Sequence, residues 1–285
     1  MSVEIQLSSM AVQLGPLSET ASLDAQVLLA SILGVNRAWV FAHPEAKITD
    51  EQEQALESSL NRLGAGEPLP YVLGSWEFFG LDFEVGPDVL IPRPETELLV
   101  EYALRWLQKK PGSRLGVDVG TGSGCIAISI AVKIPEIKMV ACDISAGALA
   151  VANNNVRRHR LSSRVHLVQS DLLSPFSIKP QRSSRFDLVC ANLPYIPTQT
   201  LQSLEVSKHE PWHALDGGWD GLDEIRCLLR AVPGQLAPGG IVLLEIEASL
   251  GEAVKALASN TFPAEQVHVI KDLAGHDRLV MVETA

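Results

Sequence analysis

The spacing of apolar positions changes along the chain and separates a helical first part from a mixed second part. Residues 1 to about 63 carry apolar side chains at helical intervals, as in SLDAQVLLASILG. Ser22 is a suitable N-cap for this segment, and Thr49 or Asp50 is suitable for a later one. The pattern predicts a small helical domain over residues 1–74.

Breakers and strand formers follow this helical part. GAGEPLPYVLG interrupts the helical spacing and predicts a linker. SWEFFG and LDFEVG have the aromatic and branched residues of short strands, so we expect a β-hairpin within residues 75–92. Pro94 then suits the first turn of a helix that opens the third part of the chain.

Strand-like and helix-like segments alternate from Arg114 to the end of the chain. This alternation is typical of an α/β fold with a parallel sheet and helices on both faces. The last two strands flank Gly275 and are joined too closely for a crossover helix, so we expect them to be antiparallel. The predicted strands are RLGVDVG, IKMVACD, RVHLVQSD, RFDLVCAN, GGIVLLEIE and the two runs within EQVHVIKDLAGHDRLVMVETA.

Composition narrows the class of protein. The chain is 46% hydrophobic with a net charge of -11, which favours a folded core and disfavours nucleic acid as a partner. The four cysteines form no CxxC pair and the histidines do not cluster, so we expect reduced core cysteines and no metal site. The start of the chain does not resemble a signal peptide, and no apolar run is long enough for a membrane span. These features predict a cytoplasmic protein that does not bind membranes.

The acid excess is concentrated in residues 1–74. Nine acidic and three basic side chains there give 3 − 9 = −6 of the total charge. One interpretation is a solvated helical surface, and the other is a surface that docks a basic protein partner.

A glycine-rich loop indicates a nucleotide-like ligand. Gly120, Gly122 and Gly124 lie between a predicted strand and helix, where the backbone can approach a ligand closely. Asp143 ends the next strand, about 20 residues later, and can accept hydrogen bonds from ribose hydroxyls. Asp171 ends the strand after it and can accept one from the adenine amine. NAD and S-adenosylmethionine both fit this pattern, and each Asp could instead be only a cap or turn residue.

The segment NLPY favours methyl transfer to a planar nitrogen. The strand RFDLVCA delivers Asn192, Leu193, Pro194 and Tyr195 at its carboxyl end. The Asn192 side-chain oxygen and the Leu193 carbonyl could each accept an N–H of a primary amide, while Tyr195 stacks on its plane. We expect Asn192 and Tyr195 to be the catalytic residues. The structural alternative is an Asn–Pro turn.

Together these residues resemble the HemK/PrmC family of peptide chain release factor glutamine N5-methyltransferases. The likeness runs through GEPLPYVLGSWEFFG, PRPETE, DVGTGSG, NLPYIP and KDLAGHDRLVMV. It implies a class I methyltransferase domain over 93–285 with a seven-stranded sheet, a substrate-docking domain over 1–74, and the GGQ glutamine of a release factor as substrate. It implies substrate binding by Asn192–Tyr195 and S-adenosylmethionine binding by Gly120, Thr121, Gly122, Ser123, Gly124, Asp143, Asp171, Leu172 and Asn192.

Two positions depart from the family pattern. Leu193 replaces the first proline of NPPY, which keeps the backbone carbonyl and removes a ring that restricts Asn192. Glu247 stands where the family commonly has glycine, so the backbone there is expected to differ.

Other functions share parts of this chemistry. A ribosomal protein glutamine could be the acceptor, and an adenine or cytosine N-methyltransferase uses a similar Asn-x-Pro-Tyr segment, although such an enzyme needs a basic groove for a flipped base. A dehydrogenase-like module would share the glycine loop alone.

Overall fold

The computed structural model describes residues 2–176 and 185–284. The chain divides into two compact units with the boundary between Ser75 and Trp76.

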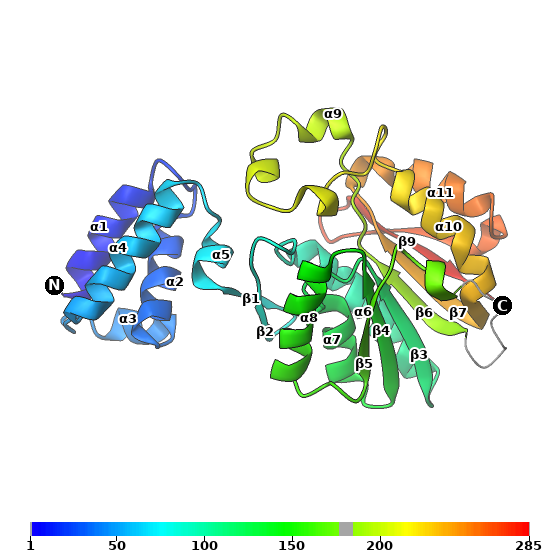
Figure 1. The fold of residues 1–285 in the computed structure, drawn as a ribbon, viewed down its shortest axis with the longest axis horizontal. Coiled ribbons are helices and arrows are strands. Elements are labelled where there is room, and N and C mark those ends of the chain that lie inside the picture. The colour runs from blue at the N-terminus through cyan, green and yellow to red at the C-terminus, as the bar shows by residue number, and fades with distance from the viewer. Residues whose placement is uncertain (1, 177–184, 285) are drawn as a thin grey trace. The chain divides into compact units, whose positions relative to one another are not determined.

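The first unit is entirely helical (Figure 1). Its helices are α1 (Val3–Leu14), α2 (Ala21–Leu33), α3 (Arg37–Ala42), α4 (Asp50–Gly64) and α5 (Leu69–Leu73). They bury one apolar cluster, including Val3, Met10, Leu28, Leu29 and Leu56.

Helix ends in this unit test two predicted caps. Thr49 caps α4 as predicted, because its hydroxyl accepts from the Gln52 N–H and the Gln52 side chain accepts from the Thr49 N–H. The prediction of Ser22 as an N-cap is wrong, since α2 begins at Ala21 after Thr20. The expected linker PLPYVL is also wrong in part: Leu69–Leu73 forms α5, because Pro70 is compatible with a first helical turn.

A two-stranded sheet of β1 (Ser75–Phe78) and β2 (Leu81–Glu84) stands at the start of the second unit, with only Ser75 before the boundary, and confirms the hairpin that the aromatic runs predicted. Phe79 and Gly80 both have positive φ, as a tight hairpin turn requires, and Glu97 accepts the Phe79 N–H at 2.8 Å. Phe78 and Phe83 of the hairpin are buried in the core of this unit.

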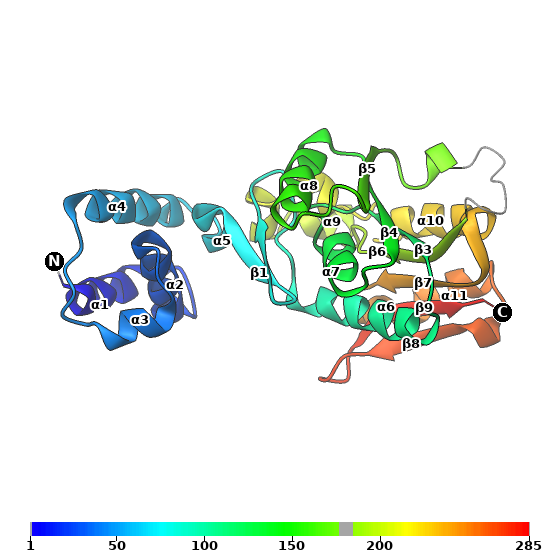
Figure 2. The same cartoon turned by 90° about the horizontal axis from the view of Figure 1, so that it is seen from below.

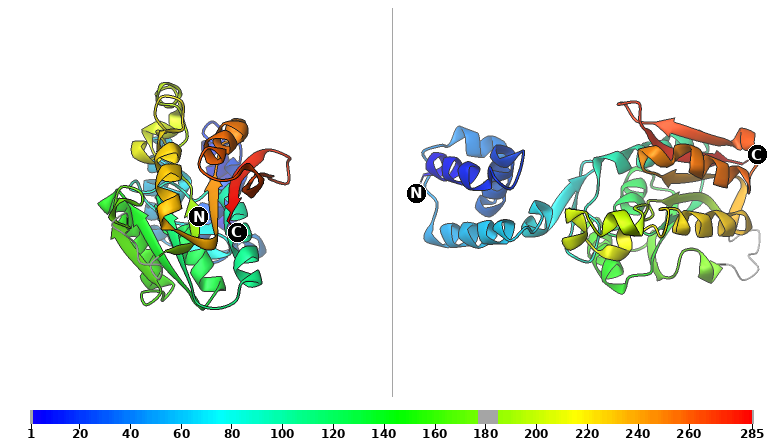
Figure 3. Two further views of the ribbon diagram at one scale, coloured as in Figure 1. Left: turned by 90° about the vertical axis from the view of Figure 1, so that its right-hand side faces the viewer. Right: turned by 90° about the horizontal axis from the view of Figure 1, so that it is seen from above.

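A seven-stranded mixed sheet forms the centre of the second unit (Figure 1). The strand order is β5-β4-β3-β6-β7-β9-β8, in which β3 to β7 are parallel and β9 is antiparallel to both β7 and β8. The antiparallel end strands, in orange and red, lie side by side in Figures 2 and 3. This confirms the predicted fold class. The bounds are β3 (Arg114–Val119), β4 (Ile137–Asp143), β5 (Val165–Gln169), β6 (Phe186–Ala191), β7 (Leu236–Glu245), β8 (Val267–Lys271) and β9 (Asp277–Glu283).

Helices cover both faces of this sheet and bury two apolar layers. The first layer includes residues of α6 (Glu97–Lys109), α7 (Cys125–Lys133) and α8 (Ala146–Arg158), together with the hairpin. The second includes residues of α10 (Asp223–Gln235) and α11 (Gly251–Ser259). The remaining elements are α9 (Thr198–Leu201) and the short 3₁₀ turns η1 (Pro94–Thr96), η2 (Ser174–Phe176), η4 (Glu205–Lys208), η5 (Trp212–Ala214), η6 (Ala248–Leu250) and η7 (Ala264–Gln266).

The four cysteines are free, and three of them are buried, as expected. Cys227 is exposed, so the prediction that it belongs to the core is wrong. Across the described ranges, no helix combines the length and the apolar character that crossing a membrane requires.

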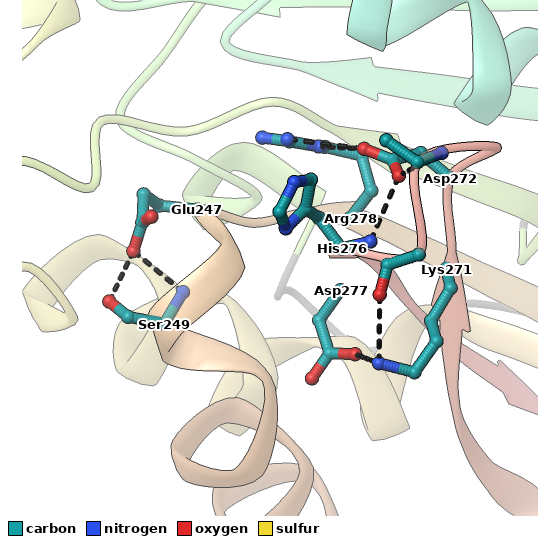
Figure 4. A network of polar contacts seen from close by, with 9 residues as sticks. Glu247, Ser249, Lys271, Asp272, His276, Asp277 and Arg278 are labelled. Carbon is teal, nitrogen blue, oxygen red and sulfur yellow. Dashed lines mark hydrogen bonds and ion pairs between the residues drawn. The ribbon is translucent and has the colours of Figure 1, made fainter.

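Glu247 adopts an ordinary extended backbone, with φ −70° and ψ 145°. Its side chain accepts from the Ser249 N–H at 2.8 Å and so caps η6 (Figure 4). The position therefore has no need of glycine, and the departure from the family pattern leaves the local backbone unstrained.

Candidate functional site

A cavity of about 420 Å³ opens at the carboxyl ends of the parallel strands. The strand order reverses between β3 and β6, which is where open α/β sheets bind ligands. Asn192, Leu193 and Pro194 line this cavity, and so do all but one of the other residues predicted to bind the cofactor. These are Gly120, Thr121, Gly122, Ser123, Asp143, Asp171 and Leu172.

Gly124 is the exception, because it does not line the cavity. It is the N-cap of α7, with a φ of +83°, and a Cβ there would come within 3.0 Å of Ile128. Glycine at this position therefore serves the turn into the helix and its packing.

The glycine loop is fixed from beneath by a buried acid. Asp118 accepts from the Thr121 hydroxyl at 2.6 Å and from the Ala127 N–H at 3.2 Å, which joins the loop to the start of α7. Burial raises the pKa of Asp118 to about 7. Gly122 has a φ of +53° and no heavy atom within 4 Å of where a Cβ would stand, so its backbone faces open space.

Asp143 closes the cavity on the β4 side. Its carboxylate is 9% exposed and accepts from the Gly122 N–H and the Ser145 N–H, both at 2.9 Å. A carboxylate offers about four lone-pair positions, so about two remain for a ligand's hydroxyl groups. Asp171 is exposed at the cavity wall. These donors and acceptors fit a nucleoside.

A second cavity of about 120 Å³ adjoins the first. Asn192, Leu193 and Pro194 line both cavities, whereas Tyr195 lines only the second. The NLPY segment is therefore the wall that the two cavities share. Burial, followed by the negative charge of Glu245, raises the pKa of the Tyr195 phenol to about 12.

The Asn192 side-chain amide has a hydrogen-bond partner at its nitrogen end only, among the described residues. Its Nδ2 donates to the Thr96 hydroxyl at 3.1 Å, and nothing in residues 2–176 or 185–284 donates to its Oδ1. Leu193 is 4% exposed, and its side chain packs over Gly120, where an added Cβ would come within 3.1 Å of it. The leucine that replaces the family's proline thus fills space against the glycine loop.

The loop after η5 supports the NLPY segment through its backbone. The Ile196 N–H donates to Leu215 O at 3.1 Å, and the Gly217 N–H donates to Ile196 O at 2.8 Å. Gly221 has a φ of +80°, and a Cβ there would overlap the Tyr195 carbonyl oxygen. Close backbone packing therefore fixes the position of NLPY.

We expect Gly221→Ala to lower turnover while leaving ligand affinity at the larger cavity near normal. The left-handed backbone costs alanine about 1–2 kcal/mol, and the overlap must also displace Tyr195. Gly275→Ala is the matched control, because Gly275 has a φ of +85° and open space around its Cβ position. Equal turnover and equal melting temperatures for the two variants would contradict this role.

Sequence reasoning missed the partners of these residues. Arg93 lines both cavities and forms an ion pair with Glu210, whose buried carboxylate also accepts the Ile91 N–H at 3.1 Å. Thr96 lies in the PRPETE motif, but its role as the acceptor for Asn192 had no signal. Glu210 and Glu245 are buried acids, and neither stands in a motif that predicts contact with NLPY.

The chain is similar to known proteins along most of its length. Residues 7–74 match the PrmC N-terminal domain and residues 95–207 the methyltransferase small domain. The chain is 39% identical to release factor glutamine methyltransferase of Geobacter sulfurreducens, over 92% of this chain and 89% of that protein. It is 41% identical to that of Moorella thermoacetica, over 91% and 90%.

A solved structure supports the fold. The 16S rRNA N2 G1207 methyltransferase of T. thermophilus, in complex with AdoMet and guanosine, superposes with a TM-score of 0.55 over 74% of this chain and 50% of that one, at 17% identity. On the sequence relatives, which span nearly its whole length, the chain belongs to the release factor glutamine methyltransferase family.

Proposed function

We propose that the protein transfers the methyl group of S-adenosylmethionine to the side-chain amide nitrogen of a glutamine in a peptide chain release factor, and that this is the glutamine of the GGQ motif. The observation that carries the proposal is the position of Asn192. It lies in the wall between a nucleoside-sized cavity and a smaller one, and no group in the described part of the chain donates a hydrogen bond to its amide oxygen.

The larger cavity fits the cofactor. In the proposal, Asp143 accepts from the ribose hydroxyls, and Asp171 and Leu172 lie at the adenine. The glycine loop, which ends at Gly124, faces the rest of the cofactor. When bound, S-adenosylmethionine supplies an electrophilic methyl group on its sulfonium. The chain's own contribution is to hold the acceptor nitrogen at the NLPY wall.

A primary amide nitrogen is a weak nucleophile, because its lone pair is delocalised into the carbonyl. In the proposal, Asn192 Oδ1 and the Leu193 carbonyl each accept one N–H, which aims the nitrogen and favours the charge it gains. Orientation can lower a barrier by about 7–11 kcal/mol, and a preorganised dipole by about 2.7–4 kcal/mol. Tyr195 stays protonated at neutral pH, because its pKa is about 12, so its part is to pack on the amide and not to act as a base.

The proposal assigns residues 1–74 to docking of the release factor, 75–92 to a hairpin linker and 93–285 to catalysis. The first 74 residues carry a net charge of −6 and only three basic side chains, which suits a basic surface on the partner. With a translation factor as substrate, we propose that the enzyme acts in the cytoplasm and contacts neither nucleic acid nor membrane directly.

The test is mass spectrometry of a release factor with an unmodified GGQ glutamine after incubation with the enzyme and isotopically labelled S-adenosylmethionine. We expect one added methyl on that glutamine, and none on a control factor in which the glutamine is alanine. Cofactor binding without transfer to the factor would reject the substrate. The same assay on ribosomal proteins and nucleic acids would then identify the acceptor class.

A further inference from the structure

A buried carboxyl group, that of Glu245, lies next to Asn192 at the end of the neighbouring strand. The parallel strands β6 and β7 pair Ala191 with Leu244, so the next residues, Asn192 and Glu245, are neighbours at the carboxyl edge of the sheet. Glu245 is 3% exposed, and its Oε2 has no hydrogen-bond partner in the described part of the chain. A buried carboxyl oxygen without a hydrogen-bond partner costs stability, so its presence beside the site needs an explanation.

Hydrogen-bonding chemistry supplies one. A carboxylate only accepts hydrogen bonds, so the end of the Asn192 amide that faces it must be the NH2 group. One of the two N–H donors already goes to Thr96 Oγ1 at 3.1 Å. The Thr96 hydroxyl, having accepted that bond, still has its own hydrogen to donate. When that hydrogen goes to the Glu245 carboxylate, the hydroxyl can only accept from Asn192, so both neighbours select the same orientation of the Asn192 side chain.

We infer that Glu245 is a positioning residue, whose carboxylate acts with the Thr96 hydroxyl to hold the NH2 end of Asn192 inward and so to turn Oδ1 toward the substrate amide. This inference rests on the proposed function, since it gives the orientation of the group that grips the glutamine. Without the carboxylate, the Asn192 amide could rotate by half a turn and present donors to a substrate nitrogen that is itself a donor.

The charge state of Glu245 makes this positioning depend on pH. Burial raises the pKa of Glu245 to about 7, while the Thr96 and Asn192 side chains and the charge of Arg278 lower it and Glu95 raises it. The charge of Glu245 in turn raises the pKa values of Tyr195 and Cys125. Arg278 is itself paired with Asp272 at 3.2 Å (Figure 4), so its charge is shared with another acid.

Above a pH of about 7 the Glu245 carboxylate can only accept hydrogen bonds, so it requires the NH2 group of Asn192. As the pH falls through this pKa, the protonated acid can also donate and no longer selects that orientation.

The first experiment uses variants that exchange donor and acceptor. We expect Glu245→Gln to lower kcat about 10- to 100-fold, as loss of an outer orienting partner commonly does, with cofactor affinity unchanged. In an Asn192→Asp background, Glu245→Gln should instead raise kcat. The new amide at position 245 can then donate to one oxygen of the carboxylate at position 192, which leaves the other oxygen facing the substrate. Glu247→Gln, on the same segment but engaged with Ser249, is the matched control and should leave kcat unchanged.

A second measurement is independent of any methyl acceptor. In protein labelled with ¹⁵N at asparagine side chains, the Asn192 NH2 signals should shift as the pH crosses the pKa of about 7 in the unmodified protein and stay constant in Glu245→Gln. Signals that do not titrate, or a Glu245→Gln enzyme with normal kcat and no reversal in the Asn192→Asp background, would overturn the inference. Lack of transfer to the release factor by the unmodified enzyme would instead count against the proposed function alone.

Discussion

Replacing Asn192 with alanine is expected to lower kcat for methyl transfer by about 10²- to 10³-fold while S-adenosylmethionine still binds. The proposed grip on the substrate amide uses one side-chain oxygen, and removal of one preorganised group of this kind costs about 10²- to 10³-fold in kcat. The variant also loses the orienting contact with Thr96, so the backbone carbonyl of Leu193 alone would have to hold the glutamine.

Single-turnover transfer from labelled cofactor, together with calorimetric binding of S-adenosylmethionine, separates the two effects. Asn154→Ala is the matched control, because Asn154 is an exposed residue of α8 whose amide donates to Glu84 Oε1 at 2.8 Å, away from the cavity lining. Turnover of the Asn192 variant close to that of the control would remove the proposed grip on the amide. A complete loss of cofactor binding would instead show that Asn192 supports the larger cavity.

The elements of this site that sequence could predict are those that a short segment defines by itself. The glycine loop, Asp143 at a strand end and NLPY at another are each set by a hydrophobic run that stops at a polar residue. Because parallel strands end at one edge of a sheet, predicting the strands was enough to predict that these residues meet.

The partners of these residues could not be predicted, because their contacts join distant segments. Thr96 is 96 positions from Asn192, and Arg93 is 117 positions from Glu210. Nothing local distinguishes Glu245 from any acid at the end of a strand. Glu245 lies next to Asn192 because of the register of β6 against β7, and this register is known only from the folded sheet.

Three predictions about single residues or short segments were wrong, and each has a reason in the helix concerned. Residue type favoured Ser22 as the N-cap of α2, but the helix begins at Ala21, after Thr20. In PLPYVL, two prolines suggested a linker although proline is tolerated in a first helical turn. The apolar neighbours of Cys227 in sequence predicted a core position, yet this residue of α10 is exposed, because only one face of the helix is buried.

Replacing Asp143 with alanine is expected to weaken S-adenosylmethionine binding by about 10²-fold or more, and to affect catalysis mainly through that loss. A hydrogen bond to a charged group contributes about 1.5–3 kcal/mol, and two ribose hydroxyls would lose their acceptor. The change also frees the Gly122 and Ser145 N–H groups, which both donate to this carboxylate at 2.9 Å, so the glycine loop loses one of its ties to β4 and keeps the backbone bonds to Cys142 O.

Asp187→Ala separates the loss of a ligand acceptor from the loss of a backbone tie. Asp187 belongs to the same sheet and accepts the Leu115 N–H at 2.9 Å, but it does not line the cavity. Calorimetry should therefore show normal cofactor affinity for this control and a large loss for Asp143→Ala. If saturating cofactor restores turnover to Asp143→Ala, its role is in binding alone. Equal affinities in the two variants would mean that the ribose hydroxyls are held elsewhere, and that the carboxylate only shapes the loop.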